Sequence, residues 1–330
     1  MRAFLLGMIG LLAVAGQTAA QGGAGAPSGN LVLYTSQLEP DAAQTVAAFR
    51  QRYPAVTVEW LRGGTNQIMP RIRAEIAAGQ PRADVLLLAD SLTFEGLKAE
   101  KLLRPSPEVD IAGTPAERHD PDRTYFGTKL LTTGIVMNTR APFTPRLWSD
   151  LLDPRARNQV AMPSPTVSGA AAIHVQTLAQ NASLGWNYWT RLASAGLQPR
   201  GGNGAVMQAV ATGERAYGIV VDYLPIREAA KGSPVRFIFP QDGVSAITEP
   251  AAVLAFSRNP TAATAFISFL LSKEGQELAS RQGFLPADPT VAPPAGFPDP
   301  KTIKVMPLDA AQAAANGEAD LRRFGALIGQ

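Results

Sequence analysis

The segments LVLY at residues 31–34, VTVEWL at 56–61 and DVLLL at 84–88 decide the fold. Residues 40–52 and 68–78 lie between them, and both carry apolar side chains at the spacing of an amphipathic helix. Short apolar strands that alternate with helices predict a β-α-β-α-β unit with a mostly parallel, doubly wound sheet. The fold class expected from this stretch is therefore α/β.

The same alternation of strands and helices returns later in the chain. The sequence pattern predicts strands at residues 130–137, 159–162, 217–221, 235–239 and 251–256. The chain ends in helical segments rather than in a third sheet, which indicates that a second α/β unit interrupts the first.

We therefore expect two doubly wound α/β lobes joined by a two-strand hinge. Lobe 1 would comprise residues 30–131 and 256–330, and lobe 2 residues 132–255. The hinge is expected near residues 131–134 and 250–254. A ligand of such sheets binds outside the carboxyl ends of the strands, so two facing lobes would hold it in the cleft between them.

The composition limits the possible partners. The chain has 330 residues, of which 46% are hydrophobic and 17% charged, so a sizeable core is expected. The 30 Lys and Arg residues nearly balance 27 Asp and Glu residues, and this argues against a nucleic-acid partner. Because cysteine is absent, disulfides, thiolate metal sites and a lipid anchor on cysteine are excluded. We expect no cofactor.

The first residues resemble an export signal. Met1-Arg2 is followed by an apolar stretch at residues 3–16, and then by the small residues Ala19-Ala20. The apolar stretch is shorter than the roughly 20 residues that span a bilayer. We expect a signal peptide at residues 1–20, a flexible leader at 21–29, and a mature protein in the periplasm.

Motifs of enzymes are scarce. The only histidines are His119 and His174, and the sequence contains neither HExxH, GxSxG nor SxxK. A chain so poor in bases and nucleophiles is more typical of a binding protein than of a catalyst. A periplasmic enzyme that acts on a phosphorylated substrate remains the alternative from another class.

Three strand-to-helix loops carry hydroxyl groups or glycines. They contain Thr35-Ser36, Ser168-Gly169-Ala170, and Asn203 within the GGNG stretch at residues 201–204. The first amides of a helix have no partner within the helix and carry a partial positive charge, so such loops favour an anion. Ordinary helix capping is the alternative explanation for each loop taken alone.

Two acidic residues also lie at strand ends. Asp222-Tyr223 follows the apolar strand at 217–221, and Glu249 precedes Pro250. If both acids faced the cleft, the ligand would be zwitterionic, with an ammonium group near a carboxylate and with Tyr223 adding a cation–π face or a hydroxyl. Capping or solvation of both acids is the other possibility.

Several segments resemble the solute-binding proteins of ABC importers. The most specific is FLLSKEGQ at residues 269–276. Weaker matches are LYTS at 33–36, ADV at 83–85, GIVMN at 134–138, PSPTVSGAA at 163–171 and AVATGE at 209–214. The resemblance covers nearly the whole mature chain. It lies in the branch that includes ferric-iron, thiamine, phosphosugar and aminoalkylphosphonate binders.

The resemblance implies a fold like that of the type II periplasmic binding proteins. It also implies that the lobes close on one small anionic or zwitterionic ligand, and that the protein docks on an ABC permease in the inner membrane. We expect a monomer.

The ligand class is open within this branch. Ferric binders of the family use a cluster of tyrosinates, commonly with adjacent Tyr residues, whereas here Tyr223 is followed by Leu224. Iron remains the alternative, with Tyr223, Asp222 and Glu249 as its ligands, because Fe³⁺ prefers anionic oxygens. The Ser168-Gly169 helix start suits a small organophosphorus anion better, including the aminoalkylphosphonates.

Overall fold

The computed structural model describes residues 26–329. The expected signal peptide at residues 1–20 lies outside the described residues, as does most of the expected leader. The last leader residue, Gly29, already belongs to the first strand, β1 (Gly29–Thr35).

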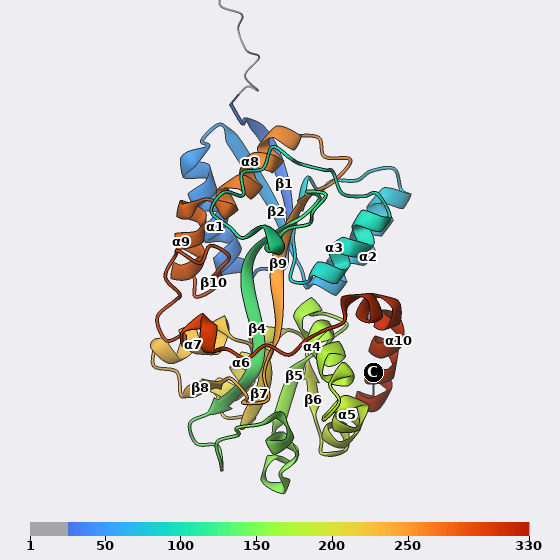
Figure 1. Ribbon diagram of the computed structural model, residues 1–330, viewed down its shortest axis with the longest axis vertical. Coiled ribbons are helices and arrows are strands. Elements are labelled where there is room, and N and C mark those ends of the chain that lie inside the picture. The colour runs from blue at the N-terminus through green and yellow to red at the C-terminus, as the bar shows by residue number, and fades with distance from the viewer. Residues whose placement is uncertain (1–25, 330) are drawn as a thin grey trace, which may run out of the picture.

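The first half of lobe 1 is the β-α-β-α-β unit that the sequence predicts (Figure 1). Strand β1 pairs in parallel with β2 (Val56–Arg62) and with β3 (Val85–Leu87). The connecting helices are α1 (Glu39–Arg52) and α2 (Thr65–Ala77), and α3 (Ser91–Ala99) follows β3.

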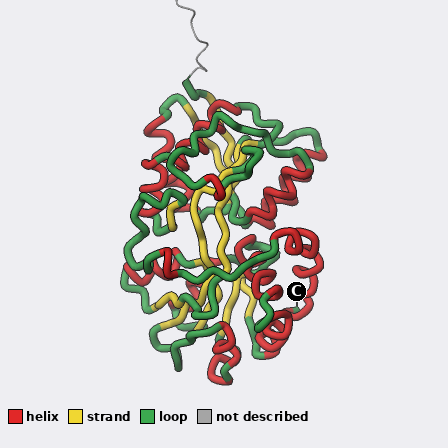
Figure 2. Tube along the Cα trace, viewed as in Figure 1, coloured by secondary structure: helices red, strands yellow, loops and turns green. Residues whose placement is uncertain are grey.

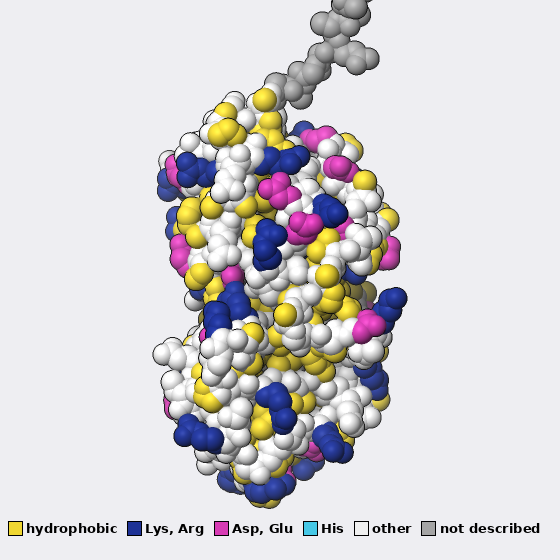
Figure 3. Space-filling view, turned by 90° about the vertical axis from the view of Figure 1, so that its left-hand side faces the viewer, with side chains coloured by type: hydrophobic (Ala, Val, Ile, Leu, Met, Phe, Trp, Pro, Cys, Tyr) yellow, Lys and Arg dark blue, Asp and Glu magenta, His cyan; other side chains and the backbone are white. Residues whose placement is uncertain are grey.

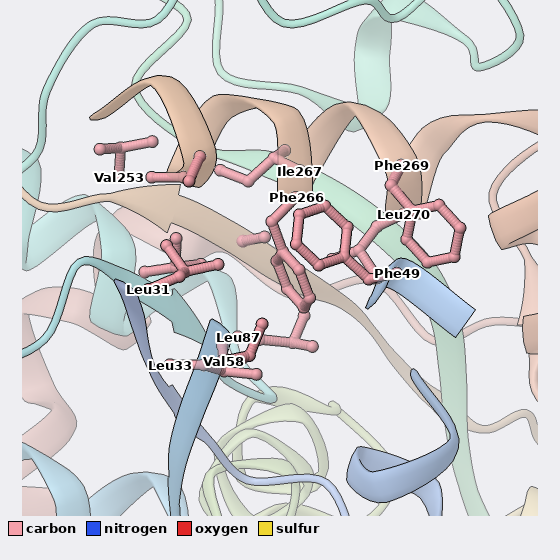
Figure 4. Packing of buried hydrophobic residues seen from close by; sticks show 14 of the residues in the cluster. Leu31, Leu33, Phe49, Val58, Leu87, Val253, Phe266, Ile267, Phe269 and Leu270 are labelled. Atoms are coloured by element: carbon pink, nitrogen blue, oxygen red, sulfur yellow. The ribbon is translucent and has the colours of Figure 1, made fainter. Parts of the chain in front are cut away.

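The core of lobe 1 forms between this sheet and helix α8 (Pro260–Leu271). Phe49 from α1 meets Phe266 and Phe269 from α8, with ring centroids 5.0 and 5.7 Å away, and these rings pack above the side chains of the sheet (Figure 4). Residues from the start of the chain and from the segment that follows β9 therefore build one core, and the separation of lobe 1 into two segments follows from this packing.

Two long strands run through both lobes. They are β4 (Phe126–Asn138) and β9 (Ser245–Val253), and they pair with each other in antiparallel fashion. All strands join one sheet in the order β2-β1-β3-β9-β4-β7-β5-β6, with β8 and β10 also paired to β4. Figure 2 shows these strands running through the middle of the molecule, and Figure 3 shows the surface narrowing between the lobes.

Lobe 2 repeats the alternation of strands and helices on the other side of these two strands. Its strands are β5 (Val160–Pro163), β6 (Gln198–Arg200), β7 (Tyr217–Val221) and β8 (Val235–Ile238). Its helices include α4 (Gly169–Gln180), α5 (Gly185–Ser194), α6 (Asn203–Ala211) and α7 (Tyr223–Ala230).

The remaining elements are short, apart from the last helix. They are α9 (Lys273–Arg281), β10 (Leu285–Pro286) and α10 (Ala310–Ile328). Single 3₁₀ turns lie at η1 (Ala116–Arg118), η2 (Trp148–Leu152), η3 (Pro154–Ala156) and η4 (Pro300–Thr302). Within residues 26–329, no helix has both the length and the apolar character needed to cross a membrane.

The last segment of the chain requires a correction to the predicted lobe boundaries. Residues 256–330 were assigned to lobe 1, but α10 packs on α4 and α5 of lobe 2. Phe324 and Met306 are buried in the lobe 2 core, and the Phe324 ring meets Trp189 edge-on at 5.1 Å. Chain order alone suggested the wrong lobe, because the apolar face of α10 does not by itself indicate which lobe covers it.

Replacing Phe324 by alanine should destabilise lobe 2. The side chain is buried, so its removal should cost about 3–5 kcal/mol of unfolding free energy. Urea or thermal unfolding of the full chain measures this loss. The exposed Arg322 on the same helix provides the control, Arg322→Ala, which should change stability by less than about 0.5 kcal/mol. Similar small losses in both variants would show that α10 does not support this core.

Candidate functional site

A small cavity lies between the lobes, where strands of both lobes end and helices begin. Its volume is about 50 Å³, enough for a few water molecules at roughly 10–15 Å³ each. Of the residues predicted from the sequence, it is lined by Ser36, Ser168, Gly169, Ala170, Asn203, Tyr223 and Glu249. Thr35 and Asp222 are not among the lining residues.

Helix starts from both lobes meet at this cavity. Gly64 and Thr65 begin α2 in lobe 1, whereas Ser168-Gly169 and Gly202-Asn203 begin α4 and α6 in lobe 2. The backbone amides of Gly169 and Ala170 make no hydrogen bond with any residue from 26 to 329. These ends supply free donors and partial positive charge to the cavity.

The polar side chains of α4 and α6 hold these two helix starts together. Ser168 Oγ caps α4 by accepting a hydrogen bond from the Ala171 amide at 3.3 Å. Asn203 Nδ2 donates to the same oxygen at 3.3 Å, and Asn203 Oδ1 accepts from the Val221 amide. Ser168 therefore positions the helix start, and the free amides behind it are the donors that a ligand would find.

In the Thr35-Ser36 loop, Thr35 supports the fold, whereas Ser36 lines the cavity. Thr35 is fully buried, and its Oγ1 accepts a hydrogen bond from the Gln37 amide at 3.1 Å. Ser36 lines the cavity, and its buried Oγ has no hydrogen-bond partner in the described part of the chain. Ser36 is thus the member of this pair whose hydroxyl is not already engaged in the described part of the chain.

Arg62 lines the cavity and was not predicted from the sequence. It is the last residue of β2, and its Nε donates to the Gln37 carbonyl oxygen at 3.2 Å. The sequence does contain a pattern that indicates this loop as part of the site, because Arg62 is followed by Gly63-Gly64-Thr65, another glycine-rich loop before a helix. A guanidinium beside several helix starts makes the cavity favourable for an anion.

Asp222 stabilises the fold and is not among the residues that line the cavity. Its carboxylate accepts hydrogen bonds from Thr132 N and Thr132 Oγ1, at 2.9 and 2.6 Å, and from Tyr223 N at 2.7 Å. Burial raises the pKa of Asp222 to about 7, although these three hydrogen bonds oppose the rise. The side chain ties the start of α7 to β4, and it is fully buried.

Glu249 and Tyr223 reach the cavity from the hinge region. Glu249 forms a buried ion pair with Lys129, with Nζ to Oε2 at 2.6 Å, and Gln37 Nε2 lies 3.4 Å from the same oxygen. The Tyr223 ring packs against Phe284 with centroids 4.2 Å apart. Burial raises the pKa of Tyr223 above its usual value, with nearby Asp41 and Glu249 acting in the same direction, so the phenol keeps its proton.

The lobes are in contact around the cavity. Asn66 Nδ2 of α2 donates to the Pro165 carbonyl oxygen of lobe 2 at 2.6 Å. A Cβ atom at Gly64 would lie only 2.2 Å from the Val167 carbonyl oxygen, so the two loops meet backbone to backbone. On the side of α1 and α7, Arg227 Nη1 forms an ion pair with buried Asp41 at 2.7 Å. The described conformation is therefore closed.

Among the described residues, no group of three or more His, Cys, Asp or Glu side chains is placed to hold a metal ion. Two of the residues considered as iron ligands already bind other side chains. Asp222 accepts a hydrogen bond from Thr132, and Glu249 forms an ion pair with Lys129.

Comparison with known proteins supports the architecture. A family model of bacterial extracellular solute-binding proteins matches residues 31–285. The Fe(3+)-binding periplasmic protein of Serratia marcescens is 25% identical over 283 residues, which cover 83% of this chain and 82% of the relative.

Solved structures show the same fold. The periplasmic binding protein AfuA of Actinobacillus pleuropneumoniae, solved with fructose-6-phosphate, superposes with a TM-score of 0.81 at 22% identity, covering 91% of this chain and 98% of AfuA. Iron-bound HitA of Pseudomonas aeruginosa gives 0.78 at 23% identity, covering 91% and 100% of the two chains. The expected two-lobed α/β fold is thereby confirmed. The chain belongs to the bacterial extracellular solute-binding protein family, and it is the periplasmic binding component of an ABC importer rather than an enzyme.

Proposed function

We propose that this protein captures a small organophosphorus anion between its lobes and delivers it to an ABC permease. The observation that carries the proposal is the meeting of Arg62 with the free amides that begin α4 in a small cavity. A phosphonate or phosphate group offers several oxygens to such donors, and it needs little volume. Export by the signal peptide at residues 1–20, and action as a monomer, belong to the same proposal.

The aminoalkylphosphonates fit this proposal through Glu249. Asp222 does not line the cavity, so Glu249 is the acid that an ammonium group of the ligand could approach. Lys129 already neutralises much of the charge on Glu249. The attraction for an ammonium group should therefore be modest, and the phosphonate end should supply most of the affinity.

Ferric iron is the second candidate. It is favoured by Tyr223 and Glu249, which line the same cavity, and by the relative from Serratia marcescens that is named an Fe(3+)-binding protein. Two features oppose it: one tyrosine lines the cavity, and the raised pKa of Tyr223 disfavours the phenolate that iron requires.

Changing Arg62 to glutamine should weaken the binding of ethylphosphonate. The loss of one charge-assisted hydrogen bond corresponds to about 1.5–3 kcal/mol, or roughly 10- to 100-fold in affinity. Isothermal titration of the purified protein measures the change, with exposed Arg322→Gln as the control. Unchanged affinity in Arg62→Gln would contradict the anion site. A visible tyrosinate band with ferric citrate that is lost in Tyr223→Phe would favour iron instead.

The wild-type protein should prefer 2-aminoethylphosphonate over ethylphosphonate by about three- to tenfold, because Glu249 is partly neutralised. The preference should disappear in the double variant Lys129→Met/Glu249→Gln, which removes both charges and so leaves neither buried alone. The affinity for ethylphosphonate should change little in this variant. Equal wild-type affinity for the two ligands would exclude Glu249 as the group that binds the amine.

The ion pair between Asp41 and Arg227 should favour the closed conformation. The double variant Asp41→Asn/Arg227→Gln should therefore show a larger radius of gyration without ligand, as measured by small-angle X-ray scattering. The matched control, Arg52→Gln/Glu274→Gln, removes an exposed ion pair within lobe 1 and should leave the radius unchanged. The same radius in both variants and the wild type would show that this contact does not bias closure.

A further inference from the structure

Two glycines in the lining of the cavity lie where the lobes touch. Gly64 immediately precedes α2 in lobe 1, and Gly169 is the first residue of α4 in lobe 2. Figure 1 shows α2 and α4 on either side of the boundary between the lobes. The space that a side chain would need at each glycine is therefore next to the opposite lobe.

A side chain at Gly64 would collide with lobe 2. A Cβ atom there would lie 2.2 Å from the Val167 carbonyl oxygen and 2.9 Å from Val167 Cγ1, and Cβ atoms in proteins essentially never approach other atoms so closely. The nearer obstacle is a backbone atom, which cannot rotate away as the end of a side chain can. The two helix starts would have to move apart.

A side chain at Gly169 would collide with lobe 1. Its Cβ atom would lie 2.4 Å from Asp90 Oδ2 and 3.1 Å from the Ala89 carbonyl oxygen. Asp90 is buried, and its carboxylate accepts hydrogen bonds from Thr93 N and Thr93 Oγ1 at 2.7 and 2.9 Å, which restrict its movement. Because the closest atom belongs to a side chain, this collision should be less severe than the one at Gly64.

Neither glycine is needed for the conformation of its own backbone. Gly64 has φ −65° and ψ 152°, which alanine also adopts, and Gly169 is not among the described residues with positive φ. At each position, the three atoms nearest to an added Cβ all belong to the opposite lobe. The requirement for glycine thus comes from the contact between the lobes and not from the fold of either lobe.

Gly202 provides a comparison within the same cavity. It also lines the cavity and immediately precedes a helix, α6, with φ −143° and ψ −176°. A Cβ atom at Gly202 would meet no atom within 4 Å. The collision is therefore specific to the two glycines at the contact, and it is not shared by every glycine at a helix start.

We propose that Gly64 and Gly169 are positioning residues that determine how far the lobes close. Because neither has a side chain, the starts of α2 and α4 can approach until the cavity between the lobes measures about 50 Å³. Alanine at either position would leave each lobe folded but hold the helix starts apart. This role concerns closure itself and does not depend on which ligand the protein binds.

A pair of introduced cysteines measures closure, because the chain has no cysteine of its own. Asn66→Cys in lobe 1 and Thr166→Cys in lobe 2 lie beside the contact between the Asn66 amide and the Pro165 carbonyl oxygen. A short reagent with two thiol-reactive groups should join them at a rate that follows the fraction of molecules with closed lobes. No ligand is added, so the outcome is independent of the proposed anion site.

Three alanine variants are compared in this two-cysteine chain. Gly64→Ala should slow cross-linking at least about tenfold, and Gly169→Ala should slow it to a smaller extent. The matched control Gly202→Ala should leave the rate unchanged. Thermal unfolding confirms that each variant is folded, and a reagent with one thiol-reactive group confirms that both cysteines remain accessible.

Three results would each overturn the proposal. The first is a two-cysteine chain that does not cross-link when all three glycines are present, because the lobes then do not reach the described contact. The second is cross-linking of Gly64→Ala or Gly169→Ala at the unaltered rate. The third is a decrease in Gly202→Ala as large as that in Gly64→Ala, which would show that the loss of glycine at a helix start, and not the collision, slows closure.

Discussion

The buried ion pair between Lys129 and Glu249 fixes the two strands on which both lobes depend. Gly127 pairs with Pro250 and Leu130 with Thr248, so Thr128 and Lys129 form a bulge in β4 opposite Glu249. Lys129 binds the Glu249 carboxylate, and Thr128 Oγ1 donates to the Glu249 carbonyl oxygen at 2.7 Å. Both charged side chains are only 3% exposed, so loss of either would leave a buried charge at a cost of about 3–5 kcal/mol. The bulge thus sets the register that places one lobe against the other.

Much of the scaffold could be predicted because its signals are local. The three apolar segments from residue 31 to 88 form the expected strands, and the loops with Ser36, Ser168 and Asn203 meet at one cavity, since they all follow strand ends. The roles of individual charges could not be predicted in this way. Asp222 is engaged by Thr132, and Glu249 by Lys129, both far away in the sequence. A strand-end acid looks the same in sequence whether it binds a ligand or another part of the fold.

Arg62 was missed for a related reason. A single arginine at the end of a strand is most often a solvated charge, and only the arrangement of α2 against α4 shows that it borders a cavity shared by both lobes. The contacts between the lobes around that cavity include the Asn66 amide, the close approach at Gly64, and the Asp41–Arg227 pair. One ligand can shift closure of this kind if it favours the closed state by a few kcal/mol.

The position of α10 determines how the protein can be divided. Lobe 2 is not a continuous insertion, because its core is completed by Met306 and Phe324 from the end of the chain. A fragment of residues 132–255 would therefore expose the apolar surface of α4 and α5 that α10 covers. Trp189 packs against Phe324, which follows all of lobe 1 in the sequence. The contacts that complete the lobe 2 core are therefore among the most distant in sequence, and such contacts form slowly during folding. An intermediate that lacks them presents exposed hydrophobic surface, which makes it a target for aggregation or for chaperones.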